Sequence, residues 1–228
     1  MGHPLLQARG ITRRYGGMEA LAPLDLDIGR GERIALTGPN GAGKTTLLTM
    51  LAGVGAPDAG AITWTEGARG AVGWVPQRPA LYPRLTVREN LRLFAGLEGA
   101  PDPTATADDL IARADLGEFA GRRAGALSTG TLQRLNLAIA LAGSPALLLL
   151  DEPSGTLSPD QRVRLWAWMD HLVTADSMAL VFSTQSMDEA ARNADRVLVL
   201  GHGRLLHDGP AGSIDEDAFM ALVDGGEG

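Results

Sequence analysis

The sequence predicts an α/β fold with a mainly parallel sheet and an inserted block of helices. Short apolar runs suited to buried strands alternate with helical patterns along most of the 228 residues, and this alternation is typical of parallel sheets. Residues 84–142 interrupt the alternation with three helical patterns and no strand pattern. An apolar fraction of 45% allows a real core. We expect one domain over residues 1–228, with a core at about 1–78 and 146–228 and a helical subdomain at about 79–145.

The first third of the chain is expected to hold several strands and one helix. The segments LLQARGITRRY, ALAPLDLDI and ERIALT are strand-like and lie within residues 4–37. The segment GPNGAGKTT then opens an apolar helix over residues 47–51, and GAVGWV at 70–75 is a further strand.

The inserted block is predicted to contain three helices. Thr86 followed by Glu89 is the signature of a capping box, and it precedes the helical pattern VRENLRLFAGL. The second helix is ATADDLIARADL at 105–116, and the third begins after Ser128 as N-cap and ends near Gly143.

The last third returns to strands alternating with helices. ALLLLDE and MALVFST are buried strands because their apolar runs are unbroken. A helix separates them, with Ser158 as N-cap and Pro159 at its first position. Ser186 and Glu189 predict another capping box, RVLVLGHGRLLHDG predicts a hairpin, and SIDEDAFMALV predicts a final helix.

Composition excludes several classes of function. The absence of cysteine excludes disulfides, zinc–thiolate sites and thiol catalysis. A formal net charge of −7 gives little attraction to nucleic acid, so no nucleic-acid partner is expected. The longest apolar stretch is broken at residues 143–145, whereas a spanning helix needs about 20 continuous apolar residues. The first ten residues lack a signal-peptide pattern, and we expect a cytoplasmic protein.

One motif predicts a phosphate site. The segment 38–45 matches G-x-x-x-x-G-K-[ST] and lies between a strand and a helix. In this motif the glycines let backbone N–H groups wrap the phosphates of a nucleotide. Lys44 is expected to reach the outer phosphates, and the Thr45 hydroxyl to ligate Mg²⁺. The alternative is a glycine-rich turn with an exposed lysine. The residues expected to contact a nucleotide are Gly38, Asn40, Gly41, Ala42, Gly43, Lys44, Thr45 and Thr46.

An acidic pair predicts the other half of the site. Asp151 and Glu152 end the buried strand that begins at 146. Asp151 is expected to hold Mg²⁺, and Glu152 to polarise an attacking water. The alternative is that the pair caps a surface loop. The polar triplet Ser183, Thr184 and Gln185 ends another buried strand, where α/β proteins often place chemistry.

These motifs, in this order, resemble the nucleotide-binding subunit of ATP-binding cassette (ABC) transporters over residues 5–210. The resemblance implies a P-loop NTPase core with an N-terminal antiparallel β subdomain and an inserted α-helical subdomain. It assigns Tyr15 to adenine stacking and Gln77 to sensing Mg²⁺ and the membrane subunit. It also places the signature motif at LSTGT, residues 127–131, with Ser128 and Gly130 contacting phosphate.

The same resemblance implies partners. Two such subunits, identical or different, close head to tail around two ATP molecules. Integral membrane permease subunits then hold the pair at the inner face of the cell membrane. The segment TVRENLRLFAGLEG resembles the drug- and polymer-exporter branch.

Four positions depart from the family pattern. Gln185 stands where histidine is usual, and an amide cannot carry a proton or a positive charge. Thr129 and Thr131 alter the usual Leu-Ser-Gly-Gly-Gln signature, and Ser158 replaces an aspartate. One hypothesis is slow or partner-dependent hydrolysis, including a heterodimer with a more typical cassette. The other is that this branch turns over normally with these residues.

The functional expectation is therefore an Mg²⁺-dependent ATPase subunit that drives a membrane transporter, with Lys44, Glu152 and Gln185 as catalytic residues. One alternative is a non-transport cassette of the DNA-repair or ribosome-associated kind. Those proteins usually carry long coiled coils or two cassettes, which 228 residues do not hold. Another alternative is an ATP-locked regulatory subunit, which Gln185 and Ser158 favour and against which Glu152 argues.

Overall fold

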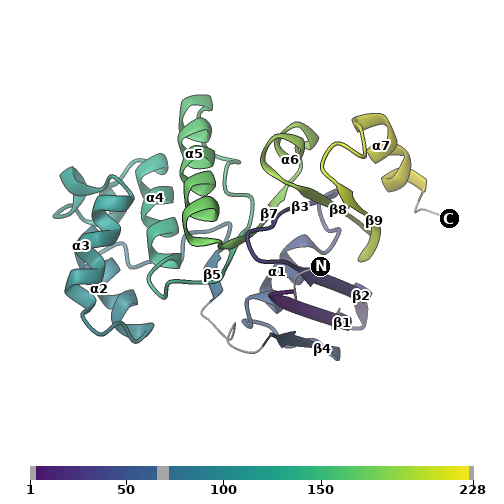
Figure 1. Ribbon diagram of the computed structural model, residues 1–228, viewed down its shortest axis with the longest axis horizontal. Coiled ribbons are helices and arrows are strands. Elements are labelled where there is room, and N and C mark those ends of the chain that lie inside the picture. The colour runs from purple at the N-terminus through teal and green to yellow at the C-terminus, as the bar shows by residue number, and fades with distance from the viewer. Residues whose placement is uncertain (1–3, 66–71, 226–228) are drawn as a thin grey trace.

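The structure is a computed structural model that describes residues 4–65 and 72–225. The strands are β1 (Leu6–Tyr15), β2 (Met18–Ile28), β3 (Arg33–Thr37), β4 (Ala59–Trp64), β5 (Val72–Val75), β6 (Leu147–Leu150), β7 (Ala179–Thr184), β8 (Arg196–Gly201) and β9 (Arg204–Pro210). The helices are α1 (Lys44–Leu51), α2 (Val87–Leu97), α3 (Pro103–Arg113), α4 (Thr129–Ala140), α5 (Pro159–Asp176), α6 (Met187–Asn193) and α7 (Glu216–Asp224). Helices α2 to α4 gather at one end of the molecule and β1, β2 and β4 at the other (Figure 1).

A six-stranded sheet forms the centre of the fold, in the order β5-β6-β7-β3-β8-β9. All neighbouring pairs are parallel except β8 and β9, which form the predicted hairpin. Side chains alternate between two cores. Leu148 and Leu150 face the helical insertion and α5, whereas Leu147 and Leu149 face α1 and the antiparallel sheet. Because both faces are covered, these strands are apolar throughout, as their sequences predict.

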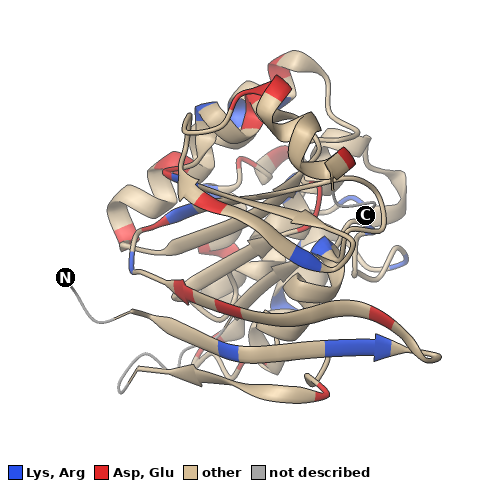
Figure 2. Cartoon of the chain, turned by 90° about the vertical axis from the view of Figure 1, so that its right-hand side faces the viewer, with Lys and Arg blue, Asp and Glu red and all other residues tan. Residues whose placement is uncertain are grey.

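The second sheet is antiparallel, in the order β2-β1-β4. Strand β4 was not predicted, because AGAITW is short, mostly exposed and interrupted by Gly60 at φ +83°. Pairing with β1 forms it. Acidic residues of β2 lie beside basic residues of β1 (Figure 2), and Arg9 pairs with Asp27 at 2.6 Å. Of the strand predicted at 70–75, residues 72–75 form β5, and 70–71 lie outside the described residues.

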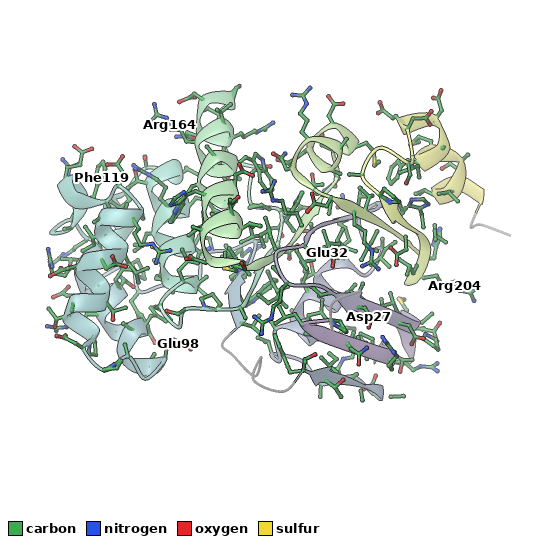
Figure 3. The ribbon with its side chains drawn as sticks, viewed as in Figure 1. Asp27, Glu32, Glu98, Phe119, Arg164 and Arg204 are labelled. Carbon is green, nitrogen blue, oxygen red and sulfur yellow. The ribbon has the colours of Figure 1, made fainter. Side chains whose placement is uncertain are left out.

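Arg196 joins the two sheets. Its guanidinium donates to both carboxylate oxygens of Asp208, at 2.5 and 2.6 Å, to Glu32 at 3.1 Å and to the Asp27 carbonyl at 2.9 Å. Glu32 and Asp27 lie where the sheets meet (Figure 3). These hydrogen bonds, first of all those to Asp208, raise the pKa of Arg196 above its ordinary value, because they stabilise the charged form. The β subdomain is thereby anchored to the central sheet.

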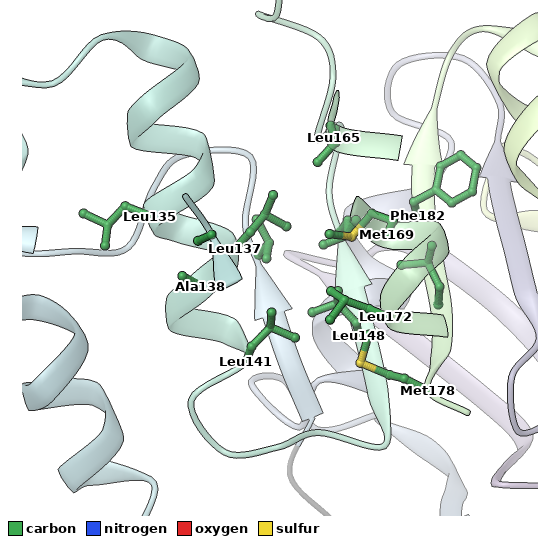
Figure 4. Close-up of a cluster of buried hydrophobic side chains, with 14 of the residues drawn as sticks. Leu135, Leu137, Ala138, Leu141, Leu148, Leu165, Met169, Leu172, Met178 and Phe182 are labelled. Atoms are coloured by element: carbon green, nitrogen blue, oxygen red, sulfur yellow. The ribbon is translucent and has the colours of Figure 1, made fainter. Parts of the chain in front are cut away.

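The helical insertion packs onto the central sheet through α4. Side chains of α4, β6 and α5 meet in one buried cluster (Figure 4). The Thr86–Glu89 capping box and the Ser128 N-cap are confirmed. The predicted bounds of α3 were wrong. It begins at Pro103 because Asp102 accepts from two backbone N–H groups, and it ends before Asp115, whose φ is +51°.

The predicted capping box at α6 is only half formed. The Ser186 hydroxyl accepts from the Glu189 N–H at 3.2 Å. The Glu189 carboxylate, however, turns to Thr184 and Trp166 instead of the Ser186 N–H. No helix among residues 4–65 and 72–225 combines the length and apolar character needed to cross a bilayer.

Candidate functional site

The candidate site lies at the carboxyl ends of β3, β6 and β7, three adjacent parallel strands. Residues 38–43 follow β3 and lead into α1, Asp151 and Glu152 follow β6, and Gln185 follows β7. Loops at this edge of an open parallel sheet converge, and ligands bind there in α/β proteins. The fold thus brings the phosphate loop, the acidic pair and Gln185 together.

Glycines give the phosphate loop its path. Gly38 has φ +144°, and a Cβ there would overlap the Leu200 carbonyl. Gly43 has φ +103°, and a Cβ there would lie 2.7 Å from the Ala20 carbonyl oxygen. Gly203, in the β8–β9 turn, donates its N–H to the Ala42 carbonyl at 3.1 Å. The loop therefore rests on neighbouring backbone at positions where only glycine fits.

Lys44 begins α1 with its side chain buried. Its Nζ donates to the carbonyl oxygens of Gly38 at 2.7 Å and Pro39 at 2.9 Å, so it lies along the inner side of the loop. Burial lowers its pKa because desolvation disfavours the ammonium, while the charges of Glu152 and Asp151 act in the opposite direction. The lysine is a buried cation beside two carboxylates.

Asp151 joins the phosphate loop to the strand ends. The Thr45 hydroxyl donates to its Oδ2 at 2.8 Å, and the Ser183 hydroxyl donates to its Oδ1 at 2.6 Å. Both oxygens are therefore oriented, and the residue is only 4% exposed. A hydroxyl facing a carboxylate oxygen is the kind of oxygen donor set that Mg²⁺ prefers, so the residues present fit a magnesium ion.

Glu152 occupies the centre of the site. Its φ of +47° is unusual for a residue with a side chain, and its N–H donates to the Ser183 hydroxyl at 2.8 Å. Gln77 Nε2 donates to Glu152 Oε2 at 2.9 Å, and Gln185 Nε2 donates to Oε1 at 2.8 Å. Gln185 also donates to Asn40 Oδ1 at 3.2 Å. One carboxylate is thus held between two amides.

Three of the predicted site residues lie apart from this group. Tyr15 ends β1 with 52% of its surface exposed, and the Arg13 guanidinium lies 4.9 Å from its ring centroid. Ser128 and Gly130 belong to the start of α4 in the helical part. The Ser128 and Thr131 hydroxyls lie 2.9 Å apart and share a hydrogen bond. The chain alone does not bring the signature motif to its own phosphate loop (Figure 1).

Sequence reasoning assigned no role to Ser183. Its hydroxyl donates to Asp151 and accepts from the Glu152 N–H, so one side chain orients both acids. The available signal was its place in the polar triplet that ends a buried strand. Gln77 was assigned to Mg²⁺, and the structure brings its amide to Glu152.

The sequence profile described as ABC transporter matches residues 21–155. The chain belongs to the ABC transporter family. The match includes the phosphate loop, Gln77, the signature motif and the acidic pair, whereas Tyr15, Ser158 and Gln185 lie outside it.

Curated relatives of the cassette carry names of both exporters and importers. The probable multidrug ABC transporter ATP-binding protein YbhF of Escherichia coli K12 is 42% identical over 221 residues, which are 92% of this chain and 38% of YbhF. The daunorubicin resistance protein DrrA3 of Streptomyces coeruleorubidus is 36% identical, covering 98% of this chain and 74% of the relative. The sulfate/thiosulfate import protein CysA of Rhodopseudomonas palustris is 37% identical, covering 96% and 67%.

Solved structures agree with the fold. The dimeric bacterial ABC transporter cassette MJ0796 superposes with a TM-score of 0.81 at 26% identity, covering 90% of this chain and 98% of that one. The protein cbiO1 of Clostridium perfringens gives a TM-score of 0.82 at 23% identity, covering 98% and 95%. The P-loop fold with an antiparallel β part and a helical insertion is thereby confirmed.

Proposed function

We propose that the cassette binds ATP with Mg²⁺, hydrolyses it, and drives a membrane exporter. The observation that carries this proposal is the placement of Glu152. Its carboxylate lies at the mouth of the glycine-rich loop, held by the amides of Gln77 and Gln185. A fixed carboxylate beside a phosphate site suits the positioning of a water for attack on a phosphoryl group.

The phosphate loop supplies the binding of ATP. The glycine backbone of residues 38–43 and the start of α1 present N–H groups to phosphate. Lys44 adds a buried positive charge, which is electrostatically stronger in this low-dielectric site than in water. Tyr15, exposed at the end of β1, is the proposed adenine contact.

Thr45 and Asp151 are the proposed holders of Mg²⁺, with Gln77 beside them. The bound ion would neutralise charge developing on the phosphates. Ser183 orients Asp151 for such an ion. Its hydroxyl donates to Asp151 Oδ1, while Oδ2 faces the Thr45 hydroxyl. This orientation belongs to the protein and does not have to be created on binding.

Glu152 is the proposed group that accepts the hydrogen bond of the attacking water, and Gln185 is the proposed contact to the γ-phosphate. The Gln185 amide has two N–H donors, and the longer bond, to Asn40 at 3.2 Å, is the one that a phosphate oxygen would replace, so that the amide holds Glu152 and the phosphate together. It remains neutral at every pH relevant to the protein. Positioning, and not proton transfer, is therefore the role that fits Gln185.

A second cassette completes the proposed site. Ser128 and Gly130 lie in the helical part, away from the loop of their own chain, so they are placed to serve a nucleotide bound by another copy. The dimeric MJ0796 structure supports such pairing. The partner is either a second copy or a related cassette. We propose that Thr129, Thr131, Ser158 and Gln185 together make hydrolysis slow or dependent on that partner.

The proposed permease contact lies beside Gln77. Large apolar side chains are exposed in the part of the chain that follows Gln77. Tyr82, 53% exposed, lies in the segment between β5 and α2, and Leu97, 69% exposed, ends α2. Movement of the helical part would carry these side chains against a membrane subunit. This contact would hold the cassette at the inner face of the cell membrane.

The proposed direction is export. The supporting observations are the likeness of residues 86–99 to the drug- and polymer-exporter branch and the identity to YbhF and DrrA3. Everted vesicles containing the cassette with its permease, and daunorubicin as the probe, test it. ATP-dependent uptake into everted vesicles supports export. Uptake only into right-side-out vesicles would contradict it.

Hydrolysis is tested first, by Mg²⁺-dependent ATPase activity of the purified protein with Glu152→Gln as the blank. Turnover above the blank means that the chain alone forms a competent dimer. Absence of turnover with intact ATP binding means that the altered residues require a partner cassette or the permease. Absence of ATP binding would overturn the proposal.

A further inference from the structure

We infer that Glu189 is a positioning residue that fixes the turn carrying Gln185, with Trp166 as its anchor on α5. The inference rests on the proposed function, because it assigns Gln185 to the γ-phosphate. Glu189 lies in the first turn of α6, four residues after Gln185. It hydrogen-bonds to both chain neighbours of Gln185, and none of the hydrogen bonds among the described residues joins it to Gln185 itself.

The two contacts clamp the turn from either side. Thr184 precedes Gln185, and its hydroxyl donates to Glu189 Oε2 at 2.6 Å. Ser186 follows Gln185, and its hydroxyl accepts from the Glu189 N–H at 3.2 Å. The Ser186 N–H closes the turn by donating to the Thr184 hydroxyl at 3.1 Å. The Thr184 hydroxyl therefore both donates and accepts within this turn, and these hydrogen bonds restrict the backbone on both sides of Gln185.

Trp166 fixes the other carboxylate oxygen. Its indole N–H donates to Glu189 Oε1 at 3.0 Å, and its ring packs against Phe182 of β7 with centroids 4.5 Å apart. The carboxylate is thus tied to α5 on one side and to the end of β7 on the other. Each oxygen has its own donor, and both hydrogen bonds are to a charged acceptor. An amide in the same place would remove that charge and would turn the Thr184 hydroxyl from donor to acceptor.

The turn formed by residues 184–186 lies beside two cavities, so its hydrogen bonds to Glu189 matter for its position. A cavity of about 190 Å³ is lined by Glu152, Gln185 and Glu189, and a second of about 530 Å³ is lined by Trp166 and Glu189. Gln185 and Ser186 are exposed, so little side-chain packing holds them. Glutamine also has one more rotatable bond than histidine, so holding its amide costs more rotamer entropy. Backbone anchoring on both sides of Gln185 reduces the freedom that remains.

The test compares nucleotides that differ in the γ-phosphate. Glu189→Gln is expected to weaken binding of the non-hydrolysable analogue AMPPNP about fivefold, because both hydrogen bonds lose their charged acceptor and the Thr184 hydroxyl has to reverse from donor to acceptor. ADP affinity is expected to stay within about twofold, since ADP lacks the group that Gln185 contacts. The kcat for ATP is expected to fall about tenfold through misplacement of Gln185. Trp166→Phe, which keeps an aromatic ring and removes the N–H, should change the same quantities in the same direction by less.

Asp188→Asn is the matched control. Asp188 carries the same charge in the same helical turn, but among the described residues its one ion pair is with Arg192, at 3.5 Å on the surface. Its replacement should leave AMPPNP and ADP affinity unchanged. In a Gln185→Ala background, Glu189→Gln should add less than about twofold to the loss of AMPPNP affinity, because the residue it positions is gone.

Three results would overturn the inference: equal losses of AMPPNP and ADP affinity, full additivity with Gln185→Ala, or an Asp188→Asn protein that behaves like Glu189→Gln. If Glu189→Gln does not fold, Trp166→Phe decides, and unchanged AMPPNP affinity in that variant counts against the inference. Failure of the proposed function is separate. It would show as a wild-type protein that binds AMPPNP no more tightly than ADP, or that binds neither.

Discussion

Gln185 Nε2 lies 2.8 Å from Oε1 of Glu152, on the opposite oxygen from the one that Gln77 holds. The amide therefore does one part of what a histidine does at this position, since it donates a hydrogen bond to the acid. It does not supply a positive charge or exchange a proton. The hydrogen bond that orients Glu152 is therefore kept, and the positive charge that a histidine could add beside the phosphates is lost.

The first prediction concerns this position. Gln185→His is expected to raise kcat several-fold, because a partly charged donor stabilises negative charge better than a neutral amide. Gln185→Ala is expected to lower kcat about tenfold or more, through loss of the bond to Glu152. Steady-state ATP hydrolysis measures both, and ATP affinity should change little in Gln185→His. A wild-type protein that already turns over fast, together with an unchanged Gln185→His, would contradict the idea of a slowed enzyme.

The second prediction concerns pH and Lys44. Burial lowers its pKa below the ordinary value of 10.5, while ATP phosphates favour the ammonium. As the pH rises through the lowered pKa, the free protein loses the proton that ATP needs, so ATP affinity falls. Binding of ATP in that range takes up protons. Calorimetric titrations in two buffers of different ionisation enthalpy measure this uptake.

Lys44 has a matching effect on stability. In the pH range between its lowered pKa and 10.5, the unfolded chain binds more protons than the folded protein, so the free energy of unfolding contributed by Lys44 rises with pH. Lys44→Met should remove this rise, along with ATP binding and the proton uptake. Unaltered proton uptake in that variant would assign the titration to another group.

The phosphate loop and the acidic pair were predictable because each is a local pattern beside a buried strand. The bond from Ser183 to Asp151 was not predictable, because it joins positions 32 residues apart. It depends on the register of β6 against β7, which pairs Leu150 with Phe182. Strand β4 was missed for a similar reason. It forms because it pairs with β1, and its own sequence has no apolar pattern typical of a strand. The Glu189 side chain was predicted to accept from the Ser186 N–H in a capping box. It accepts instead from Trp166 and Thr184, and the Trp166 donor lies on another helix and cannot be read from the local sequence.

The third prediction concerns Gly130 in the signature motif. A Cβ at this position would lie 2.7 Å from Cδ of Gln161, whose Oε1 accepts from the Ser158 N–H at 3.1 Å. Gly130→Ala should therefore displace Gln161 and weaken the start of α5, lowering the free energy of unfolding by about 1 kcal/mol. Thermal or denaturant unfolding measures it. Gln161→Ala removes the obstacle, so Gly130→Ala should cost nothing further in that background, and an additive loss would exclude this contact as the cause.

The fourth prediction concerns Ser183. Ser183→Ala leaves Asp151 Oδ1 without its hydroxyl donor in buried surroundings, and the partly buried Glu152 N–H without its acceptor. The free energy of unfolding should fall by about 1–3 kcal/mol. The Mg²⁺ concentration that half-saturates ATP binding should rise several-fold, because Asp151 is no longer pre-oriented. Fluorescent ATP binding at varied Mg²⁺, together with denaturant unfolding, measures the two effects.

Thr37 provides the matched control for Ser183. It lies on β3 at the same edge of the sheet and is also fully buried, but its hydroxyl has no hydrogen-bond partner among the described residues. Thr37→Val keeps the side-chain shape and removes an unpaired polar atom, so stability should hold or rise. If Ser183→Ala and Thr37→Val lower the free energy of unfolding equally, the loss comes from removing a hydroxyl at this edge of the sheet and not from the two hydrogen bonds of Ser183. A loss confined to Ser183 identifies the two hydrogen bonds to the acidic pair as its source.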